Sequence, residues 1–255
     1  MWEDELARDW SDAVRFSLPD LDVFQINADA NPPVETAAVS GVGTILFNMI
    51  VNPVNGNLYV TNTEANNRVR FEGFGDYVND IGPKPSGGPA SVRGHLHEAR
   101  ITVIEPSLNV RPRHLNKHIP YDLSPVPDGV KEKSVATPLQ MAISSDGTTL
   151  YVVGFSSNTV TKYDAAQLEN DTFEPSLSNT AGIKGASGIV LDESRNLLLV
   201  TSRQTNRLFT LDATTLQLLT TSSMHNPEPG AIINGRKFLY DATLTSSNGE
   251  ASCSS

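Results

Sequence analysis

Short apolar runs separated by turn residues fill the stretch from Pro138 to Asp164. The runs comprise residues 139–143, 150–153 and 160–163. Asp146–Gly147 separates the first two runs, and this pair predicts a β-hairpin because Gly accepts the positive φ of a tight hairpin turn. Ser156–Asn158 separates the second run from the third. The stretch therefore predicts a meander of short antiparallel strands.

The same pattern returns 48 residues later without a gap. The matching positions are Ile143 and Leu191, Leu150 and Leu198, Tyr151 and Leu199, Val152 and Val200, Asn158 and Asn206, Val160 and Leu208, and Asp164 and Asp212. Repeats of about 40–50 residues that each hold several short strands are typical of β-propeller blades. Residues 137–182 and 183–224 are thus two clear predicted blades.

The first half of the chain shows the pattern more loosely. Residues 13–42 look like the back half of a blade, with strands expected over 14–18, 23–28 and 36–39. Residues 43–136 predict a further blade, with strands expected over 45–51, 58–62 and 101–105. An insertion of about thirty residues, from 70 to 98, separates the second of these strands from the third. Loops of this length tend to be functional or flexible, so a contact surface and a solvated loop both stay open.

We therefore expect an all-β chain: a β-propeller with about three and a half to four blades, followed by a short helical C-terminal extension. Propellers close into rings of roughly 4–8 blades, which removes the exposed edges of their sheets. Residues 1–226 are accordingly expected to be part of a larger ring of roughly seven blades. The chain as a whole is expected to be a fragment of a longer protein.

Composition narrows the class of function. The 255 residues carry a formal net charge of −10, and the sequence pI is about 4.9. A nucleic-acid binder needs basic residues to neutralise phosphates, so this balance argues against one, and also against docking on an anionic membrane. No apolar run approaches the ~20 residues of a membrane helix, and the acidic first residues do not resemble a signal peptide. A single cysteine, Cys253, excludes an internal disulfide framework.

The order of motifs within a blade carries a first resemblance. A turn at Asp146–Gly147 is followed by Leu150–Val152, by Ser157–Val160 and by a strand that ends at Asp164. This order resembles the YVTN-type β-propeller repeat family, well over residues 137–223 and more loosely over 13–110. The resemblance implies the propeller fold and no particular function. Most motif residues are expected to be structural, because Asn and Asp close turns by bonding nearby backbone.

The last residues carry a second resemblance. Residues 231–240 have a helix-compatible apolar pattern, and the stretch Gly235-Arg-Lys-Phe-Leu-Tyr-Asp-Ala-Thr-Leu-Thr is followed by Cys253-Ser-Ser. It resembles the opening of a cytochrome c domain of the di-haem cytochrome c peroxidase type, in which a Gly-Arg-x-Leu-Phe-x-Asp-x-x-Leu-Ser helix and loop precede a Cys-x-x-Cys-His haem site. The resemblance implies that residues 227–255 begin a truncated cytochrome c-like domain, with Cys253 as the first cysteine of a truncated haem c motif.

Haem c is thereby implied for the full-length parent, and none is expected on this chain. Two thiols add to the haem vinyl groups, and the adjacent His becomes the proximal iron ligand. One thiol without that His gives neither full attachment nor ligation. Residues after about Pro227 should also pack poorly, because a helix without the rest of its domain loses its apolar partners.

His95 and His97 are weak candidates for a metal site. Strand side chains alternate, so both rings would lie on one side of an extended segment. Further ligands could come from nearby His and Glu residues, namely His114, His118, Glu98 and Glu105. Ordinary polar contacts around a loop are the competing interpretation. The sequence has no Gly-x-Ser-x-Gly, His-Glu-x-x-His or P-loop motif, and Asp192 and Glu193 are expected to cap a turn, so no catalytic residue is assigned.

By resemblance, the chain is the propeller portion of an exported haem c redox protein, periplasmic or secreted, that serves electron transfer or peroxidase-like chemistry. The propeller would be a scaffold that binds a protein redox partner or a small-molecule ligand, and this chain alone would be inactive. A non-catalytic binding module and a lactonase-like propeller hydrolase are the alternatives. The hydrolase needs charged or His residues at the starts of the inner strands, whereas the positions near Ile45, Leu139 and Ser187 are mostly apolar or small.

Overall fold

The computed structural model describes residues 7–13, 20–66, 95–121, 123, 125–174 and 183–255. The chain divides into two compact units, residues 1–41 with 66–96, and residues 42–65 with 97–255. In the first unit, strands β1 (Val23–Asn27) and β2 (Val34–Val39) form an antiparallel pair. These strands confirm the expectations over 23–28 and 36–39. The strand expected over 14–18 lies outside the described residues.

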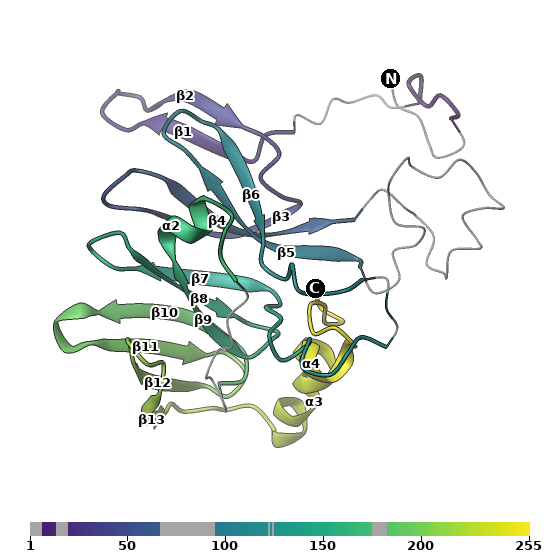
Figure 1. The fold of residues 1–255 in the computed structure, drawn as a ribbon, viewed down its shortest axis with the longest axis vertical. Helices are drawn as coiled ribbons and strands as arrows, with labels where there is room; N and C mark the ends of the chain where they lie inside the picture. Colours follow the sequence, from purple (N-terminus) through teal and green to yellow (C-terminus); the bar gives the residue numbers. More distant parts are fainter. Residues whose placement is uncertain (1–6, 14–19, 67–94, 122, 124, 175–182) are drawn as a thin grey trace. The chain divides into compact units, whose positions relative to one another are not determined.

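Antiparallel sheets build the second unit, and they lie side by side in Figure 1. One sheet contains β3 (Ile45–Val51), β4 (Leu58–Ala65), β5 (His97–Ile104) and β6 (Val110–His114). The next contains β7 (Pro138–Ile143), β8 (Thr149–Gly154) and β9 (Thr159–Asp164). The third contains β10 (Ala186–Asp192), β11 (Leu197–Ser202), β12 (Arg207–Asp212) and β13 (Leu218–Ser223).

Within each sheet, strands that are neighbours in space are also consecutive in the chain. This up-and-down order is the order of strands in a propeller blade. The predicted all-β class and the predicted strands of the two clear blades are confirmed. The number of blades in a complete ring stays a prediction.

The turns between strands form where the sequence supplies Gly and Asn. Gly147 has a φ of 71°, and the Asp146 side chain beside it accepts a hydrogen bond from the Thr148 N–H at 3.0 Å. Asn158 and Asn206, which are 48 residues apart, have φ values of 58° and 53°. Asn tolerates this left-handed conformation better than most residues. The sequence repeat is therefore also a repeat of backbone conformation.

Alternating side chains on β8 connect two apolar cores. Leu150 and Val152 belong to the core between β7–β9 and the sheet that begins with β3, where they join Tyr59 and Ile101. Tyr151 and Val153 belong to the core shared with the sheet that begins with β10, whose members include Ile189, Leu198, Val200 and Phe209. Because successive strand residues point to opposite faces, one strand serves both cores. Burial of these apolar side chains holds the neighbouring sheets together.

Short helices complete the second unit. They are α2 (Ala165–Glu169), the 3₁₀ turn η1 (Glu193–Arg195), α3 (Gly230–Tyr240) and α4 (Ala242–Thr245). The helix predicted over 231–240 is confirmed as α3. Helices α3 and α4 lie at one end of the strands, at the yellow end of the colour scale in Figure 1. Among the described residues, no helix is both long and apolar enough to cross a membrane.

One predicted boundary is wrong. The insertion was expected to run to residue 98, but β5 begins at His97, where His97 pairs with Ala65 and Glu98 pairs with Glu64. The reason is that β4 continues to Ala65, beyond the predicted end at residue 62, and its backbone groups need partners on the adjacent strand. The rest of the predicted insertion, residues 67–94, lies outside the described residues.

Candidate functional site

The residues after α3 pack against the sheets of the second unit. We call residues 241–252 the strap. The Ala242 N–H donates to the Ser156 carbonyl at 2.9 Å, and the Ser252 and Ser156 hydroxyl oxygens are 3.2 Å apart. Ala242 is fully buried, and Asn248 and Glu250 are only 4% and 2% exposed. The expectation that residues after Pro227 pack poorly is therefore wrong for the strap, because polar anchors hold it in place of the apolar partners considered above.

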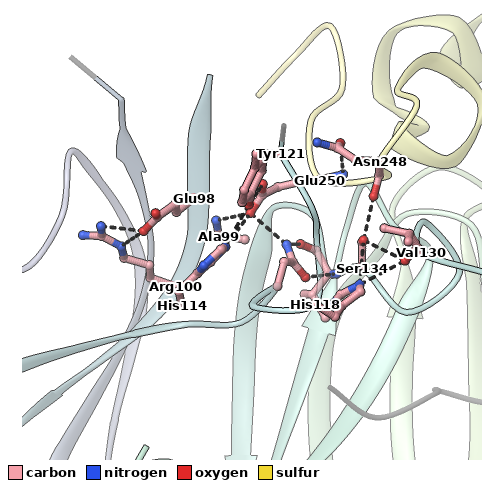
Figure 2. A network of polar contacts seen from close by, with 12 residues as sticks. Glu98, Ala99, Arg100, His114, His118, Tyr121, Val130, Ser134, Asn248 and Glu250 are labelled. Carbon is pink, nitrogen blue, oxygen red and sulfur yellow. Dashed lines mark hydrogen bonds and ion pairs between the residues drawn. The ribbon is translucent and has the colours of Figure 1, made fainter. Parts of the chain in front are cut away.

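Glu250 is the most deeply engaged residue of the strap (Figure 2). Its Oε1 atom accepts hydrogen bonds from the Ala99 N–H at 3.0 Å and from Asn116 Nδ2 at 2.9 Å. His114 Nε2 lies 3.2 Å from the same oxygen. The Tyr121 hydroxyl donates to the other carboxylate oxygen, Oε2. A single carboxylate thus meets four partners, which we call the Glu250 receptor.

The receptor is held by the sheet and by the chain that leaves it. Ala99 lies in β5, and its carbonyl accepts from the Leu115 N–H at 2.9 Å while its own N–H points to Glu250. Asn116 is fixed through Val135, because Nδ2 donates to the Val135 carbonyl and Oδ1 accepts from the Val135 N–H, both at 2.8 Å. The Tyr121 ring stacks on His114, with centroids 6.0 Å apart. These contacts place the donors independently of Glu250.

Electrostatics keep the Glu250 carboxylate ionised. Burial is the largest single influence and opposes ionisation, but the hydrogen bonds and charge of His114, together with Tyr121 and the Ala99 N–H, outweigh it and lower the pKa of Glu250. Burial, followed by the charge of Glu250, raises the pKa of Tyr121, so its hydroxyl stays protonated and donates. A carboxylate that is ionised and held by four partners suits an anchor better than a general base, which needs a free position toward its substrate.

A second polar contact holds the strap two residues earlier. The Ser134 hydroxyl donates to the Asn248 carbonyl at 2.6 Å and lies 3.2 Å from His118 Nε2 (Figure 2). His118 Nε2 also lies 3.0 Å from the Val130 carbonyl. Burial lowers the pKa of His118, which favours the neutral ring that donates from Nε2. The strap backbone is thus tied to Ser134, next to Val135, the residue that fixes Asn116 of the Glu250 receptor.

Gly249 lets the strap approach this segment closely. Its φ is 77°, and a Cβ atom placed there would stand 2.7 Å from the Lys131 carbonyl oxygen. Contacts under 3.0 Å do not occur for real Cβ atoms, so a side chain would push the strap away. The glycine between Asn248 and Glu250 therefore allows both neighbouring residues to reach their partners.

The sequence-predicted site residues lie apart from this network or join it in another role. Cys253 is a free, exposed thiol one residue beyond the strap. The His95 carbonyl accepts from Asn66 Nδ2 at 3.0 Å, and His97 lies at the start of β5. Within the described part of the chain, no group of three or more His, Cys, Asp or Glu residues could hold a metal ion. His114 and His118, the possible further metal ligands, contact Glu250 and Ser134.

The remaining candidate carboxylates are engaged in local contacts. Glu98 accepts from the Arg100 guanidinium at 2.6 and 2.8 Å, which Figure 2 shows beside the receptor. Glu105 pairs with Arg111 at 2.6 Å. Asp192 accepts from the Arg195 N–H at 3.2 Å, which confirms that it caps a turn.

Sequence reasoning named His114, as a possible metal ligand, but missed Glu250 and its other three partners. Glu250 stands among small and polar residues, and Asn116 and Tyr121 belong to irregular chain after β6. The available signal was the Asn248–Gly249 pair, which marks a turn. A turn does not reveal that the residue after it is buried against strands over a hundred positions away.

Comparisons with known proteins give similarity of fold only. No protein-family model and no curated protein matches the sequence. The β-propeller domain of Myceliophteria thermophila Cps50 matches at a TM-score of 0.44 and 9% identity, over 80% of this chain and 54% of that one. Kuenenia stuttgartiensis hydrazine synthase matches at a TM-score of 0.47 and 15% identity, over 72% of this chain and 49% of that one. The periplasmic gluconolactonase of Pseudomonas aeruginosa matches at a TM-score of 0.45 and 12% identity, over 77% of this chain and 47% of that one. The chain thus spans about half the length of these solved structures.

Proposed function

We propose that this chain joins part of a β-propeller to the beginning of a haem c-binding lobe, and that Cys253 forms one of the thioether bonds to the haem. The observation that carries the proposal is the exposed Cys253 thiol directly beyond a strap that is anchored to the sheets. A cofactor attached there would be held at a defined place on the propeller. The motif order of residues 235–255 supports the same assignment.

The residues present fit the first half of a haem c site. Cys253 is exposed, so its sulfur and hydrogen can add across a haem vinyl group to give a thioether. No His follows His225 in the sequence, so the iron ligand would come from residues beyond Ser255, as the Cys-x-x-Cys-His pattern requires. Bound haem would supply reversible electron transfer. The strap would orient the attachment point.

Exposed apolar side chains on the C-terminal helices also support an additional lobe. Helix α3 has no buried residue. Its side chains Ile232, Phe238 and Leu239 are 56%, 63% and 44% exposed, and Leu244 of α4 is 56% exposed. Clusters of exposed apolar side chains are typical of surfaces that another domain or partner covers. A haem-bearing lobe that follows Ser255 would cover them.

The sheets serve this function as a scaffold. We propose that they belong to a ring of roughly seven blades, of which this chain supplies about half. By the same resemblance the complete protein is exported, and it carries electrons or activates peroxide with a protein or small-molecule partner.

The coding sequence that continues from residue 255 tests the proposal first. We expect the next two codons to specify Cys and His. The full-length product, made in a host that matures c-type cytochromes, should keep its haem on a denaturing gel. In a Cys253→Ser variant one vinyl group stays conjugated, so the α band of the pyridine haemochrome should move to longer wavelength. A different continuation, or a full-length product without covalent haem, would refute the proposal in favour of a non-catalytic binding module.

A further inference from the structure

We propose that the Glu250 receptor is a recognition site for one ionised carboxylate, that Glu250 occupies it in cis, and that this contact positions the Cys253 segment on the sheets. The first two parts stand on the contacts of the receptor alone. The third part, as it concerns haem, rests on the proposed function. Glu250 is therefore a positioning residue for the cofactor segment.

The shape of the receptor matches a carboxylate. Carboxylate oxygens only accept hydrogen bonds, and each has two lone pairs. Ala99, Asn116 and His114 converge on Oε1 of Glu250, while the Tyr121 hydroxyl meets Oε2. A neutral Gln amide would replace charge-assisted hydrogen bonds with weaker ones, and its NH₂ group could face Tyr121 only if that hydroxyl turned from donor to acceptor. The site consequently distinguishes Glu from its isostere Gln.

The receptor stays assembled when its occupant leaves. Val135 fixes Asn116 through two hydrogen bonds, and the β5 ladder fixes the Ala99 N–H. The stacked His114 and Tyr121 also contact each other directly, since the Tyr121 hydroxyl and His114 Nε2 are 3.0 Å apart. Donors that are held in advance lose little entropy on binding an anion. A vacated receptor should therefore accept a small carboxylate from solution.

The strap has few other anchors near Cys253. Beyond Glu250, residues 251–255 reach the sheets through contacts between hydroxyl groups, from Ser252 to Ser156 at 3.2 Å and from Ser255 to Thr137 at 3.5 Å. The Ser252 contact is only partly buried and the Ser255 contact is exposed, so water competes for hydroxyl groups of the strap end. The position of Cys253 thus depends mainly on the buried carboxylate three residues before it.

A label at Cys253 measures the positioning. Cys253 is the single cysteine and is exposed, so a nitroxide reagent reacts there alone in the full chain. We expect a motionally restricted spectrum for the unsubstituted protein and a mobile spectrum for Glu250→Ala. Backbone amides of residues 241–252 should exchange at least roughly tenfold faster in that variant. Glu132→Ala, which removes an exposed carboxylate of the neighbouring segment, is the matched control and should change neither measurement.

Chemical rescue tests recognition separately from positioning. Glu250→Ala removes the atoms of an acetate ion, so sodium acetate at neutral pH is the matched probe. Acetate should raise the Tm of Glu250→Ala by roughly 2–4 °C relative to sodium chloride at the same ionic strength, because a ligand of the folded state stabilises it. The nitroxide should stay mobile, since free acetate has no bond to the strap. The unsubstituted protein and Glu132→Ala should show no acetate-specific shift.

The outcomes separate the parts of the proposal. Equal acetate effects on all three proteins would overturn the recognition site. A restricted label in Glu250→Ala would overturn the positioning role. If Glu250→Ala does not fold, Glu250→Gln takes its place in the exchange measurement. Amide exchange of residues 241–252 at the unsubstituted rate in Glu250→Gln would contradict carboxylate recognition. Failure of the haem proposal would show instead in the continuation of the coding sequence, and it would leave these three measurements unaffected.

Discussion

Helix α3 and the strap are consecutive in the chain, yet they are held in opposite ways. The helix exposes its large apolar side chains, and its tethers are the Arg236 guanidinium on the Gln204 carbonyl at 3.1 Å and the edge contact of Tyr240 with Phe155. The strap buries Asn248 and Glu250 and uses their polar atoms as anchors. Apolar character therefore does not identify the docked part of this C-terminal region. The buried part is polar and fully partnered, which is the condition for burying such groups at all.

Asn116→Ala should have the largest effect on the strap. The substitution removes a donor to Glu250 and leaves the buried Val135 N–H and carbonyl without their partner. We expect a loss of about 3 kcal/mol in the free energy of unfolding, measured by urea denaturation, because unpaired buried polar groups cost about 1–3 kcal/mol each. Asn109→Ala, at an exposed Asn that bonds only the Glu105 side chain, should cost less than about 0.5 kcal/mol. Equal losses of unfolding free energy in the two variants would show that the contacts of Asn116 stabilise the protein no more than those of an exposed Asn.

Ser134→Ala should weaken the strap at its second anchor. It removes the hydroxyl that donates to the carbonyl of the buried Asn248. We expect a loss of about 1–2 kcal/mol in the free energy of unfolding, together with faster amide exchange in the strap. Ser107→Ala is the control, because its hydroxyl contacts only the exposed part of Glu105. An unchanged strap in Ser134→Ala would show that the Asn248 contact is not an anchor and that Glu250 and the contacts with Ser156 hold the strap.

The sequence predicted the sheets because strands and turns are encoded locally. The strand expected over 45–51 is β3, and the runs at 139–143 and 150–153 lie in β7 and β8. Alternating side chains, with Gly and Asn at the turns, identify such elements within a window of a few residues. The strand expected to begin at residue 101 begins at His97, and this error arose where β4 extends past its apolar run into Thr63–Ala65, whose pairing is set by the partner strand.

The Glu250 receptor could not be predicted in the same way. Glu250 and the Ala99 N–H are 151 positions apart in the chain, and Tyr121 comes from a stretch without periodicity. Which donors converge is decided by how β6 ends and how the chain returns to Val135. The motif at residues 235–255 points to Cys253, whereas the carboxylate that we propose positions it, Glu250, lies three residues earlier and is recognised only from its contacts in the fold.

Acid should release the strap in two steps of decreasing pH. Burial lowers the pKa of His118 below its ordinary 6.5, and the surrounding charged groups are Lys133, Glu250 and His114. The unfolded chain therefore binds a proton near pH 6.5 that the folded chain does not, so stability falls as the pH drops below this value. The lowered pKa of Glu250 adds stability that is present above pH 4.5 and is lost as the pH falls through its folded-state pKa.

Urea denaturation at a series of pH values separates these two groups. In His118→Gln the free energy of unfolding should no longer fall just below pH 6.5, but it should still fall below pH 4.5. In Glu250→Gln the fall below pH 6.5 should remain, and the fall below pH 4.5 should disappear. Amide exchange of residues 241–252 should follow the same two windows. A His118→Gln protein with the unsubstituted pH dependence would assign the upper window to another group.

Substitutions on α3 should have the smallest effect in this chain and a large one in a longer product. Ile232 and Leu239 are 56% and 44% exposed, and Gln has a helix propensity as good as theirs or nearly so. We expect Ile232→Gln and Leu239→Gln to change the free energy of unfolding by less than about 0.5 kcal/mol. In a product that continues past Ser255, the proposed lobe would bury these side chains, and each substitution should then cost roughly 1.5–3 kcal/mol. Equally small effects in the present chain and in the longer product would mean that α3 has no apolar partner. Helix α3 would then stay exposed, in contrast to the strap, in the longer product too.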